Sequence, residues 1–374
     1  AANGVIIITT KKGKVGEPKI TVQSFYGSQT AANDVDALNA VDLGKYLYLA
    51  DYYAGKTPSH GQYTYSGTPE NPQISVPDYV FPSGASEASV DRSLYSLTPD
   101  NVYPIVKSAD TNWWEEVTRA APMWQTSIDA SAANESSQYA FNATMFSQDA
   151  ITEFQGYKRV SVRINSSTKT LDDKLEIGEN FTISLDSRKG TFQNDQEQNA
   201  VSGSYKHHPL LPVYDITGFF AGSRGLNLGN NSNPYATISR GQDNYRNRSR
   251  VFGNVFAQLE IAGDFKLRSS FGTNIELQKT LGIGRANPEY VEGNFNNGST
   301  SAFNSEYEWV WTNTLSWDKT INDTHELSAY VGVEAIEGFG EYFGASRNQF
   351  PFENKEIISY LDAGNQGTAG NFGN

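Results

Sequence analysis

From about residue 120 onward, hydrophobic and polar residues alternate in long runs that are separated by short polar turns. This period of two is the pattern of β-strands whose two faces meet different surroundings. In the run from Lys158 to Asn165, Val160, Val162 and Ile164 share one side and the residues between them are polar. We therefore predict an all-β, antiparallel chain.

The runs predict one isolated strand followed by four hairpins, nine strands in all. The strands are predicted at residues 20–26, 124–128 with 139–145, 158–165 with 175–186, 251–261 with 265–277, and 307–317 with 327–333. The segments between hairpins are much longer than the turns inside them and include residues 31–122 and 187–246, rich in Gly, Pro, Asn and Tyr. Structureless loops of this length are uncommon in compact soluble domains, whereas outer-membrane barrels combine short periplasmic turns with long extracellular loops.

A soluble β-sandwich also alternates its faces, so periodicity alone leaves two architectures open. The strands are longer than the typical ~5–6 residues of globular proteins. On the apolar face, Trp309 and Trp317 lie roughly 20 Å apart along a tilted strand, close to the ~25 Å between the aromatic girdles of membrane barrels. The pattern favours a transmembrane β-barrel, and a sandwich remains the alternative.

Charged residues such as Arg159, Arg163 and Lys266 occupy mid-strand positions on the polar face, where a barrel places a wet lumen and a sandwich places solvent. Two polar residues interrupt the apolar face. Glu179 is the exception in its strand, and Asn313 predicts a local bulge or a protein contact. Because an open sheet in lipid leaves unpaired edge groups that cost several kcal/mol each, we expect further strands after Asn374.

Composition narrows the function classes. The chain has 374 residues, 38% hydrophobic residues, 13% aromatic residues and a net charge of −13. Such an excess of acidic groups argues against nucleic acid as a partner, because there is no surplus of Lys and Arg to neutralise phosphates. There is no Cys, which removes disulfides, thiolate zinc sites and thiol catalysis. No apolar run is long enough for a membrane helix.

The opening residues 1–27, AANGVIIITTKKGKVGEPKITVQSFYG, resemble the junction between plug and first barrel strand in the SusC/RagA family of TonB-dependent outer-membrane transporters. Residues 111–151, 158–187, 207–215 and 247–276 resemble the family as well. The resemblance implies that residues 1–14 are the C-terminal end of the plug domain and that residues 15–374 are the N-terminal part of the barrel. The resemblance implies a barrel of 22 strands, of which about nine would lie in this chain.

The same resemblance implies a function and partners. It implies active import of a glycan, or of a peptide, across the outer membrane of a Gram-negative cell, energised by TonB and assisted by a SusD-like surface lipoprotein. The TonB-contacting region lies before Ala1 in such proteins, so no coupling residue can be assigned. Residues 36–53 have apolar spacing suited to a short helix and resemble a family element that follows the first strand.

Two other function classes stay open: a passive porin-like or glycan-binding surface β-protein, and a surface hydrolase. Carboxylate pairs such as Glu115 with Glu116, or Glu306 with Glu308, are read as solvated faces, because sequence gives no distance between them. We assign no catalytic, cofactor or metal residue and leave the ligand-binding residues unknown. The prediction is therefore a transporter without covalent chemistry.

Several smaller motifs have simpler explanations than a functional site. His207 and His208 are adjacent without nearby carboxylates, so we expect a loop rather than a metal site. Gly282-Ile283-Gly284 lacks the third glycine of a dinucleotide loop and is read as a turn. The N-x-S/T triplets at Asn134, Asn142, Asn165, Asn180 and Asn322 are attributed to composition, not glycosylation. Five loop aromatics are candidates either for stacking on sugar rings or for packing within the loops: Trp113, Trp114, Tyr214, Phe219 and Phe220.

Overall fold

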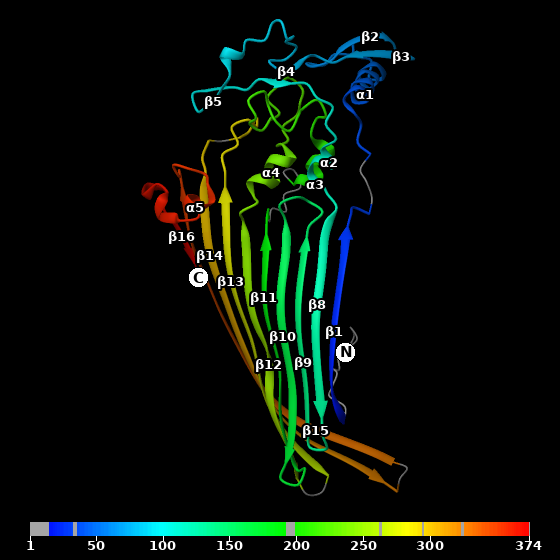
Figure 1. Cartoon of the computed structure of the whole chain (residues 1–374), viewed down its shortest axis with the longest axis vertical. Coiled ribbons are helices and arrows are strands. Elements are labelled where there is room, and N and C mark those ends of the chain that lie inside the picture. Colours follow the sequence, from blue (N-terminus) through cyan, green and yellow to red (C-terminus); the bar gives the residue numbers. More distant parts are fainter. Residues whose placement is uncertain are drawn as a thin grey trace.

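The computed structural model describes residues 15–32, 36–191, 199–261, 264–293, 295–322 and 325–373. Its main element is a ten-stranded antiparallel sheet whose strands lie side by side in chain order (Figure 1). The strands are β1 (Gly16–Gln29), β8 (Ala121–Ala133), β9 (Ser137–Asp149), β10 (Gly156–Thr170), β11 (Leu175–Lys189), β12 (Tyr245–Ile261), β13 (Phe265–Gly284), β14 (Gly298–Ile321), β15 (His325–Asn348) and β16 (Gly370–Gly373).

All nine predicted strands are present, and the four predicted hairpins are the pairs β8–β9, β10–β11, β12–β13 and β14–β15. The strands extend further than the alternation indicated, up to 24 residues in β14 and β15. The sequence did not predict β16, which pairs with β15 over only four positions. The expected plug segment, residues 1–14, lies outside the described residues, and the division into plug and barrel stays a prediction.

The unbroken register from β8 to β15 separates the sheet into an apolar face and a polar face. Val160 stands opposite Leu185 on one neighbour and Met145 on the other, and the same alignment continues across the sheet. Val160, Ile183, Val255 and Phe271 are between 44% and 48% exposed on this apolar face. The other sheets of the described chain have two strands each, so no second sheet of a sandwich covers the apolar face within the described residues.

The polar interruptions of the apolar face are accommodated locally. The hydroxyl of Ser166 on β10 donates to the Glu179 carboxylate on β11. The indole N–H of Trp311 donates to Ser269 Oγ at 3.0 Å. The bulge predicted at Asn313 is wrong, because the pairing of β14 with β13 and β15 runs one residue to one residue through this position.

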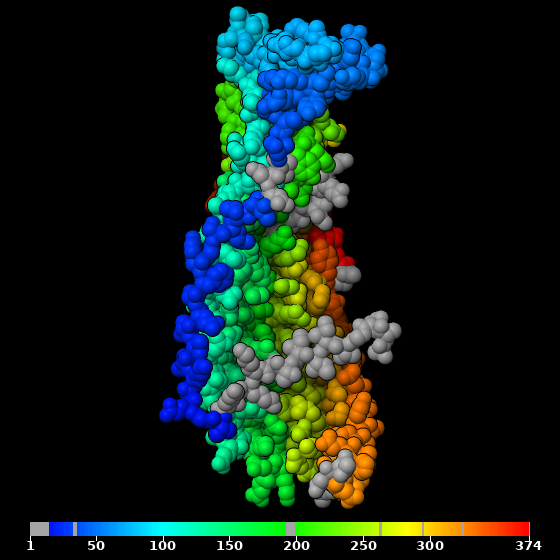
Figure 2. Space-filling model, turned by 90° about the vertical axis from the view of Figure 1, so that its right-hand side faces the viewer, coloured from blue at the N-terminus to red at the C-terminus, as the bar shows by residue number. Residues whose placement is uncertain are grey.

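The long connections were predicted as loops, but they fold into a cap. We use "cap" for residues 36–118 and 199–244, which gather at one end of the sheet (Figures 1 and 2). Short hairpin turns occupy the other end. The cap elements are α1 (Ala40–Tyr53), β2 (Thr64–Thr68), β3 (Asn71–Ser75), β4 (Tyr79–Phe81), η1 (Arg92–Leu94), β5 (Ser96–Thr98), β6 (Asn101–Tyr103), β7 (Val106–Lys107), α2 (Trp113–Val117), α3 (Ala200–Lys206) and α4 (Pro234–Arg240).

The cap has its own hydrophobic core, to which both of its segments contribute. Val80, Val106 and Trp113 from the first segment pack with Leu210 and Leu211 from the second, all at most 2% exposed. A buried amide stabilises the second segment, because Asn233 Nδ2 donates to the carbonyl oxygens of Val213 and Ala221 at 2.9 Å each. The largest buried cluster of the described chain therefore lies outside the sheet, where sheet periodicity gives no signal.

The helix predicted within residues 36–53 is present as α1 and begins at Ala40, after the side chain of Asn39 accepts the backbone N–H of Asp42. Within the described residues, no helix combines the length and apolar character needed to cross a membrane.

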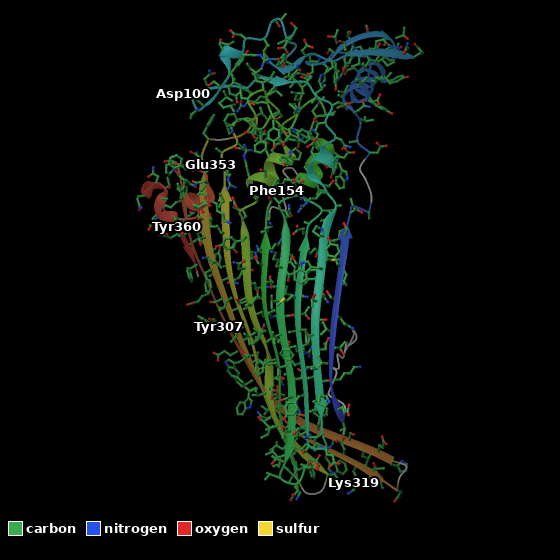
Figure 3. The ribbon with its side chains drawn as sticks, in the orientation of Figure 1. Asp100, Phe154, Tyr307, Lys319, Glu353 and Tyr360 are labelled. Atoms are coloured by element: carbon green, nitrogen blue, oxygen red, sulfur yellow. The ribbon has the colours of Figure 1, made fainter. Side chains whose placement is uncertain are left out.

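The turn predicted at Gly282-Ile283-Gly284 is wrong, because these residues end strand β13 and pair with β14. Ile283 is buried against Phe350 and Ile358 in a small cluster. Ile358 belongs to α5 (Lys355–Ile358), which is followed by two short 3-10 helices, η2 (Leu361–Ala363) and η3 (Gln366–Thr368). Figure 3 shows the full span of the sheet, with Lys319 at the turn end and Glu353 near the cap end.

Candidate functional site on the polar face of the sheet

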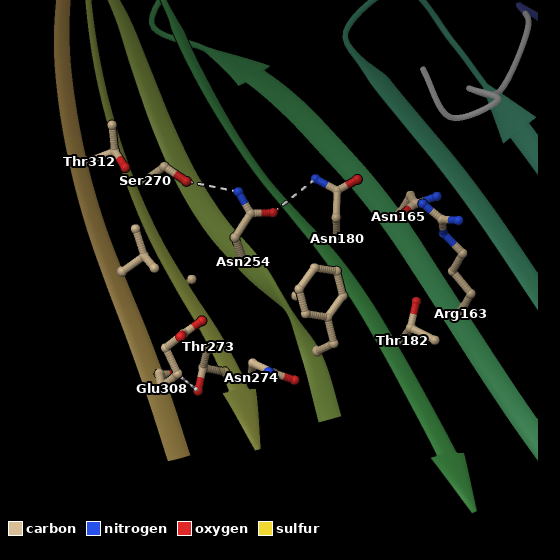
Figure 4. Close-up of a pocket in the computed structure, with 14 residues that line it drawn as sticks. Arg163, Asn165, Asn180, Thr182, Asn254, Ser270, Thr273, Asn274, Glu308 and Thr312 are labelled. Atoms are coloured by element: carbon tan, nitrogen blue, oxygen red, sulfur yellow. Dashed lines mark hydrogen bonds between the residues drawn. The ribbon is translucent and has the colours of Figure 1, made fainter. Parts of the chain in front are cut away.

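The polar face is the side of the sheet to which Arg163, Asn180, Asn254, Ser270 and Glu308 belong. Each residue stands on a different strand, from β10 to β14. The antiparallel register places Arg163 level with Glu308, Asn180 level with Asn254 at the next polar-face position, and Ser270 one such position further along. They surround a cavity of about 320 Å³ near the middle of the sheet (Figure 4). The predicted alternation thus yields a continuous hydrophilic surface with a hollow at its centre.

A short row of hydrogen bonds crosses three strands at this cavity. Asn180 Nδ2 donates to Asn254 Oδ1 at 3.4 Å, and Asn254 Nδ2 donates to Ser270 Oγ at 2.8 Å (Figure 4). Amide and hydroxyl groups both donate and accept hydrogen bonds, so they can exchange partners with water or with a polar solute. Asn180, Asn254 and Ser270 therefore offer uncharged hydrogen-bonding groups that can change partners.

Charged groups line the polar face closer to the cap. Arg248 Nε lies 3.0 Å from Asp186 Oδ2, and Arg248 Nη1 lies 3.7 Å from Glu276 Oε2. Arg250 Nε donates to Asn274 Oδ1 at 2.9 Å. Arg248 is therefore paired with two carboxylates, whereas the partner of Arg250 is a neutral amide.

Aromatic rings also belong to the polar face, which the alternation of the sequence did not indicate. Phe252 lines the cavity and is 56% exposed. Phe256 lies four residues further along β12 on the same face, and the Arg268 guanidinium lies 3.8 Å from its ring centroid. The polar face is therefore amphipathic where β12 crosses it.

The histidine pair lies in a loop, as expected, directly after α3 ends, and it is buried there. Burial lowers the pKa of His207 to about 3 and that of His208 to about 4. The ring of His207 packs edge-on against Trp113 with centroids 4.7 Å apart. Among the described residues, no cluster of three or more His, Cys, Asp and Glu is arranged to hold a metal. The two histidines are therefore buried, uncharged side chains of the cap at neutral pH.

The other candidate residues are scattered. Glu115 and Glu116 are exposed in the first turn of α2, and Glu306 and Glu308 stand two residues apart on the polar face of β14. Trp113 is 2% exposed and Phe220 stacks on Tyr214, whereas Phe219 is 61% exposed. Among the asparagines of the N-x-S/T triplets, Asn142, Asn165 and Asn180 lie within strands. The structure brings none of the carboxylate pairs into a catalytic arrangement with another candidate.

Sequence reasoning found the polar face but missed the cavity on it. Most lining residues are polar residues at polar-face positions of an alternating run, and that signal was available. Which residues meet across strands depends on register, which a single sequence does not state. Phe252 was hidden because it is an apolar residue at a polar-face position.

The geometry defines a class first: a wide antiparallel sheet with one apolar face, one polar face and long loops at a single end, which is the fold class of outer-membrane transporters. Comparisons with known proteins agree. No family model matches the chain. The chain is 22% identical over 373 residues to TonB-dependent receptor P3 of Formosa agariphila and 23% identical over 369 residues to TonB-dependent receptor P39 of the same organism. The alignments include 95% and 96% of this chain, but only 31% and 30% of the lengths of the two relatives.

Solved structures give the same result for the fold. The RagAB peptide importer matches all of this chain in its "open-open" state, with a TM-score of 0.73 and 20% identity, and in its "closed-closed" state, with a TM-score of 0.70 and 20% identity. The chain covers 40% and 41% of those structures. The resemblance to SusC/RagA-type TonB-dependent transporters is thereby confirmed: the chain is related to TonB-dependent receptors and has the barrel fold of the RagA type.

Proposed function

We propose that the protein containing this chain imports a nutrient across the outer membrane, with the polar face of the sheet lining the path and the cap lying on the extracellular side. The observation that supports this most is the division of one sheet into an apolar face with half-exposed Val, Ile and Phe and a polar face with a central cavity. Lipid covers the first face and the solute or the plug meets the second.

The finer parts of the proposal rest on family resemblance. They are energy coupling through TonB, a SusD-like lipoprotein over the cap, a glycan or a peptide as the transported ligand, and residues 1–14 as the end of the plug. Import requires no covalent step, so no residue is assigned a catalytic role. Loop and lumen contacts set the choice of ligand in this scheme.

The experiment that tests the proposal compares uptake with and without TonB. Cells that carry the full-length gene are supplied with radiolabelled oligosaccharides or peptides, and import is measured in a strain with TonB and in a strain that lacks it. We expect import to depend on both the gene and TonB. Import that continues unchanged without TonB indicates a passive porin-like channel, and a full-length protein that stays in the aqueous phase without detergent indicates a secreted glycan-binding protein.

A further inference from the structure

Among the five loop aromatics, Phe219 differs from the others in its wide exposure at a cavity. Phe220 is held between the ring of Tyr214, with centroids 5.4 Å apart, and the guanidinium of Arg240, 5.0 Å from its ring centroid. Trp113 belongs to the cap core. Phe219 is 61% exposed and lines a cavity of about 380 Å³. Of the five aromatic candidates, Phe219 alone therefore combines wide exposure with a place on the wall of this cavity.

This cavity is distinct from the one on the polar face and lies where the cap meets the upper ends of the strands. Its walls come from segments far apart in sequence: Leu97 on β5, Phe219, the end of α4, Pro288 after β13, and Glu353 before α5. Figure 3 shows Glu353 at this level, between the sheet and the cap. A site assembled from several long loops is placed to meet a solute before the solute reaches the lumen.

The backbone that carries Phe219 is held in a defined turn. Asp215 Oδ1 accepts the backbone N–H groups of Thr217 at 2.8 Å and of Phe219 at 3.1 Å, and Gly218 has a φ of +86° in the same turn. Asp215 Oδ2 accepts the Tyr95 hydroxyl at 2.8 Å. Burial raises the pKa of Tyr95 to about 12, so this hydroxyl keeps its proton at neutral pH. The backbone that presents the ring is thus fixed before binding, which lowers the entropy lost when a ligand binds.

The charges at the cavity neutralise one another. Arg240 makes a bidentate ion pair with Glu289, at 2.7 and 2.9 Å, and the Glu289 side chain is 3% exposed. Arg285 is bound to Asp243 and to backbone carbonyl groups. Both arginines that line the cavity are therefore engaged, and neither is free to bind an anion.

The remaining polar groups at the cavity are one carboxylate, that of Glu353, and the neutral side chains of Ser239 and Gln242. Glu353 Oε1 accepts the backbone N–H of Ala286 at 2.8 Å, and no ion pair to Glu353 occurs within the described residues. Ser239 and Gln242 also line the cavity and make no side-chain hydrogen bond to the described residues. A sulfate, uronate or peptide carboxylate would meet Glu353 and no available cation, so anionic ligands are disfavoured.

We propose that this cavity binds a neutral saccharide ring. The C–H face of a pyranose packs on Phe219, and its hydroxyl groups bond to Ser239, Gln242 and Glu353, because hydroxyls both donate and accept. This inference rests on the proposed function, since it names the ligand class at the outer end of the path. Phe219 contacts the ligand, and Asp215 acts by positioning Phe219.

The test measures binding to the full-length protein in detergent by isothermal titration calorimetry. The neutral probes are cellohexaose, maltohexaose and laminarihexaose, and the charged comparators are hexagalacturonate and a lysine-containing hexapeptide. We expect at least one neutral hexasaccharide to bind, and Phe219→Ala to weaken that binding about tenfold, or ~1.4 kcal/mol. The matched control is Phe352→Ala, because Phe352 is 63% exposed and does not line the cavity.

Three results overturn the proposal: no neutral hexasaccharide binds, Phe219→Ala leaves the affinity unchanged, or a charged comparator binds more tightly in a Phe219-dependent manner. The last result with the lysine peptide would assign the cavity to peptides instead. Uptake measured with and without TonB separates this outcome from a failure of the transport proposal. Phe219-dependent binding without TonB-dependent uptake refutes import and keeps the site, and the reverse result refutes the site alone.

Discussion

At the scale of single residues, burial decides what the histidines and aromatics of the cap can do. His207 and His208 look like a metal motif in the sequence, yet both are buried and neither belongs to a metal-binding cluster in the described chain. Trp113 and Phe219 look equivalent in the sequence, yet one is core and the other is exposed. Such differences arise from contacts between segments about 100 residues apart, for example the bond from the Trp113 indole to the His208 carbonyl oxygen, and local patterns do not encode them.

The buried histidines predict a pH dependence of cap stability. Because the folded-state pKa of His207 is lowered to about 3 from the ordinary 6.5, the unfolded cap takes up a proton first as the pH falls. The stabilising contribution of a neutral His207 is therefore complete above pH 6.5 and is lost as the pH falls toward about 3. We expect the protection factors of the amides in residues 200–211, which are the intrinsic exchange rates divided by the observed ones, to fall as the pH is lowered through this window.

The matched variant is His207→Phe, which keeps an aromatic ring beside Trp113 and removes the titrating group. Neither ring nitrogen of His207 has a hydrogen-bond partner in the described structure, so the substitution breaks no such bond. We expect the protection factors in the variant to depend less steeply on pH than in the wild type, with a remaining slope from His208. Equal slopes in the two proteins would rule out His207 as the source.

At the scale of elements, the sequence predicted the strands well because alternation is a local property. Each of the nine predicted strands was found, since a half-exposed strand must repeat every two residues. The short β16 was missed because four residues, Gly370–Gly373, carry too little pattern. Gly282-Ile283-Gly284 was misread because glycines suggest a turn, whereas here they end a strand beside a small hydrophobic cluster.

The close pairing of β11 and β12 predicts a cost for one glycine substitution. A Cβ added at Gly253 would collide with the carbonyl oxygen of Asn180 and lie 2.6 Å from Phe181 Cδ1. We expect Gly253→Ala to lower the free energy of unfolding by about 1–3 kcal/mol, because the backbone of β11 must shift. The measurement is the unfolding midpoint of the full-length protein in urea and detergent.

Gly282→Ala is the control, because a Cβ at Gly282 would have no neighbouring atom within 4 Å. Both positions lie in long strands of the same sheet, so general effects of alanine in a strand are shared. The account expects the control to unfold near the wild-type midpoint. A Gly253→Ala protein as stable as the Gly282→Ala protein would show that the β11–β12 spacing is looser than described.

At the scale of the whole molecule, the sheet and the cap have opposite designs. The cap buries its apolar residues in a core, as in a soluble domain, whereas the sheet leaves Val, Ile, Leu and Phe half exposed along one face. Composition suggested this in part, because the chain has few aliphatic residues but many aromatic ones. The cap core could not be predicted, since it joins segments that the strand pattern treated only as loops.

An apolar face in contact with lipid predicts a strong asymmetry between neighbouring positions on β14. Trp311 lies on the apolar face and is 50% exposed, while Thr312 lies on the polar face and donates to Glu334 at 2.9 Å. We expect Trp311→Arg to lower stability in liposomes, but by less than the ~2–4 kcal/mol that Arg costs at the bilayer midplane, because Trp311 lies only two residues from Trp309 at the predicted aromatic girdle. Thr312→Arg places its charge beside Glu334 and should cost much less.

Trp311→Leu controls for loss of the indole, because leucine remains compatible with lipid. Its effect on the free energy of unfolding should be smaller than that of Trp311→Arg. If Trp311→Arg and Thr312→Arg proved equally tolerated, the two faces of β14 would not meet different surroundings.

The most direct test of the central claim, that lipid covers the apolar face, introduces single cysteines into a full-length protein from which any other cysteine has been removed; this chain itself contains none. Single cysteines are placed at successive positions of β13, labelled with a nitroxide in the full-length protein in membranes, and probed with oxygen and with a water-soluble nickel chelate. The account predicts that Leu267, Phe271 and Ile275 are accessible to oxygen and that Arg268, Ser270 and Asn274 are not lipid-exposed. Equal accessibility of the two sets, or a water-exposed Phe271 position, would contradict it.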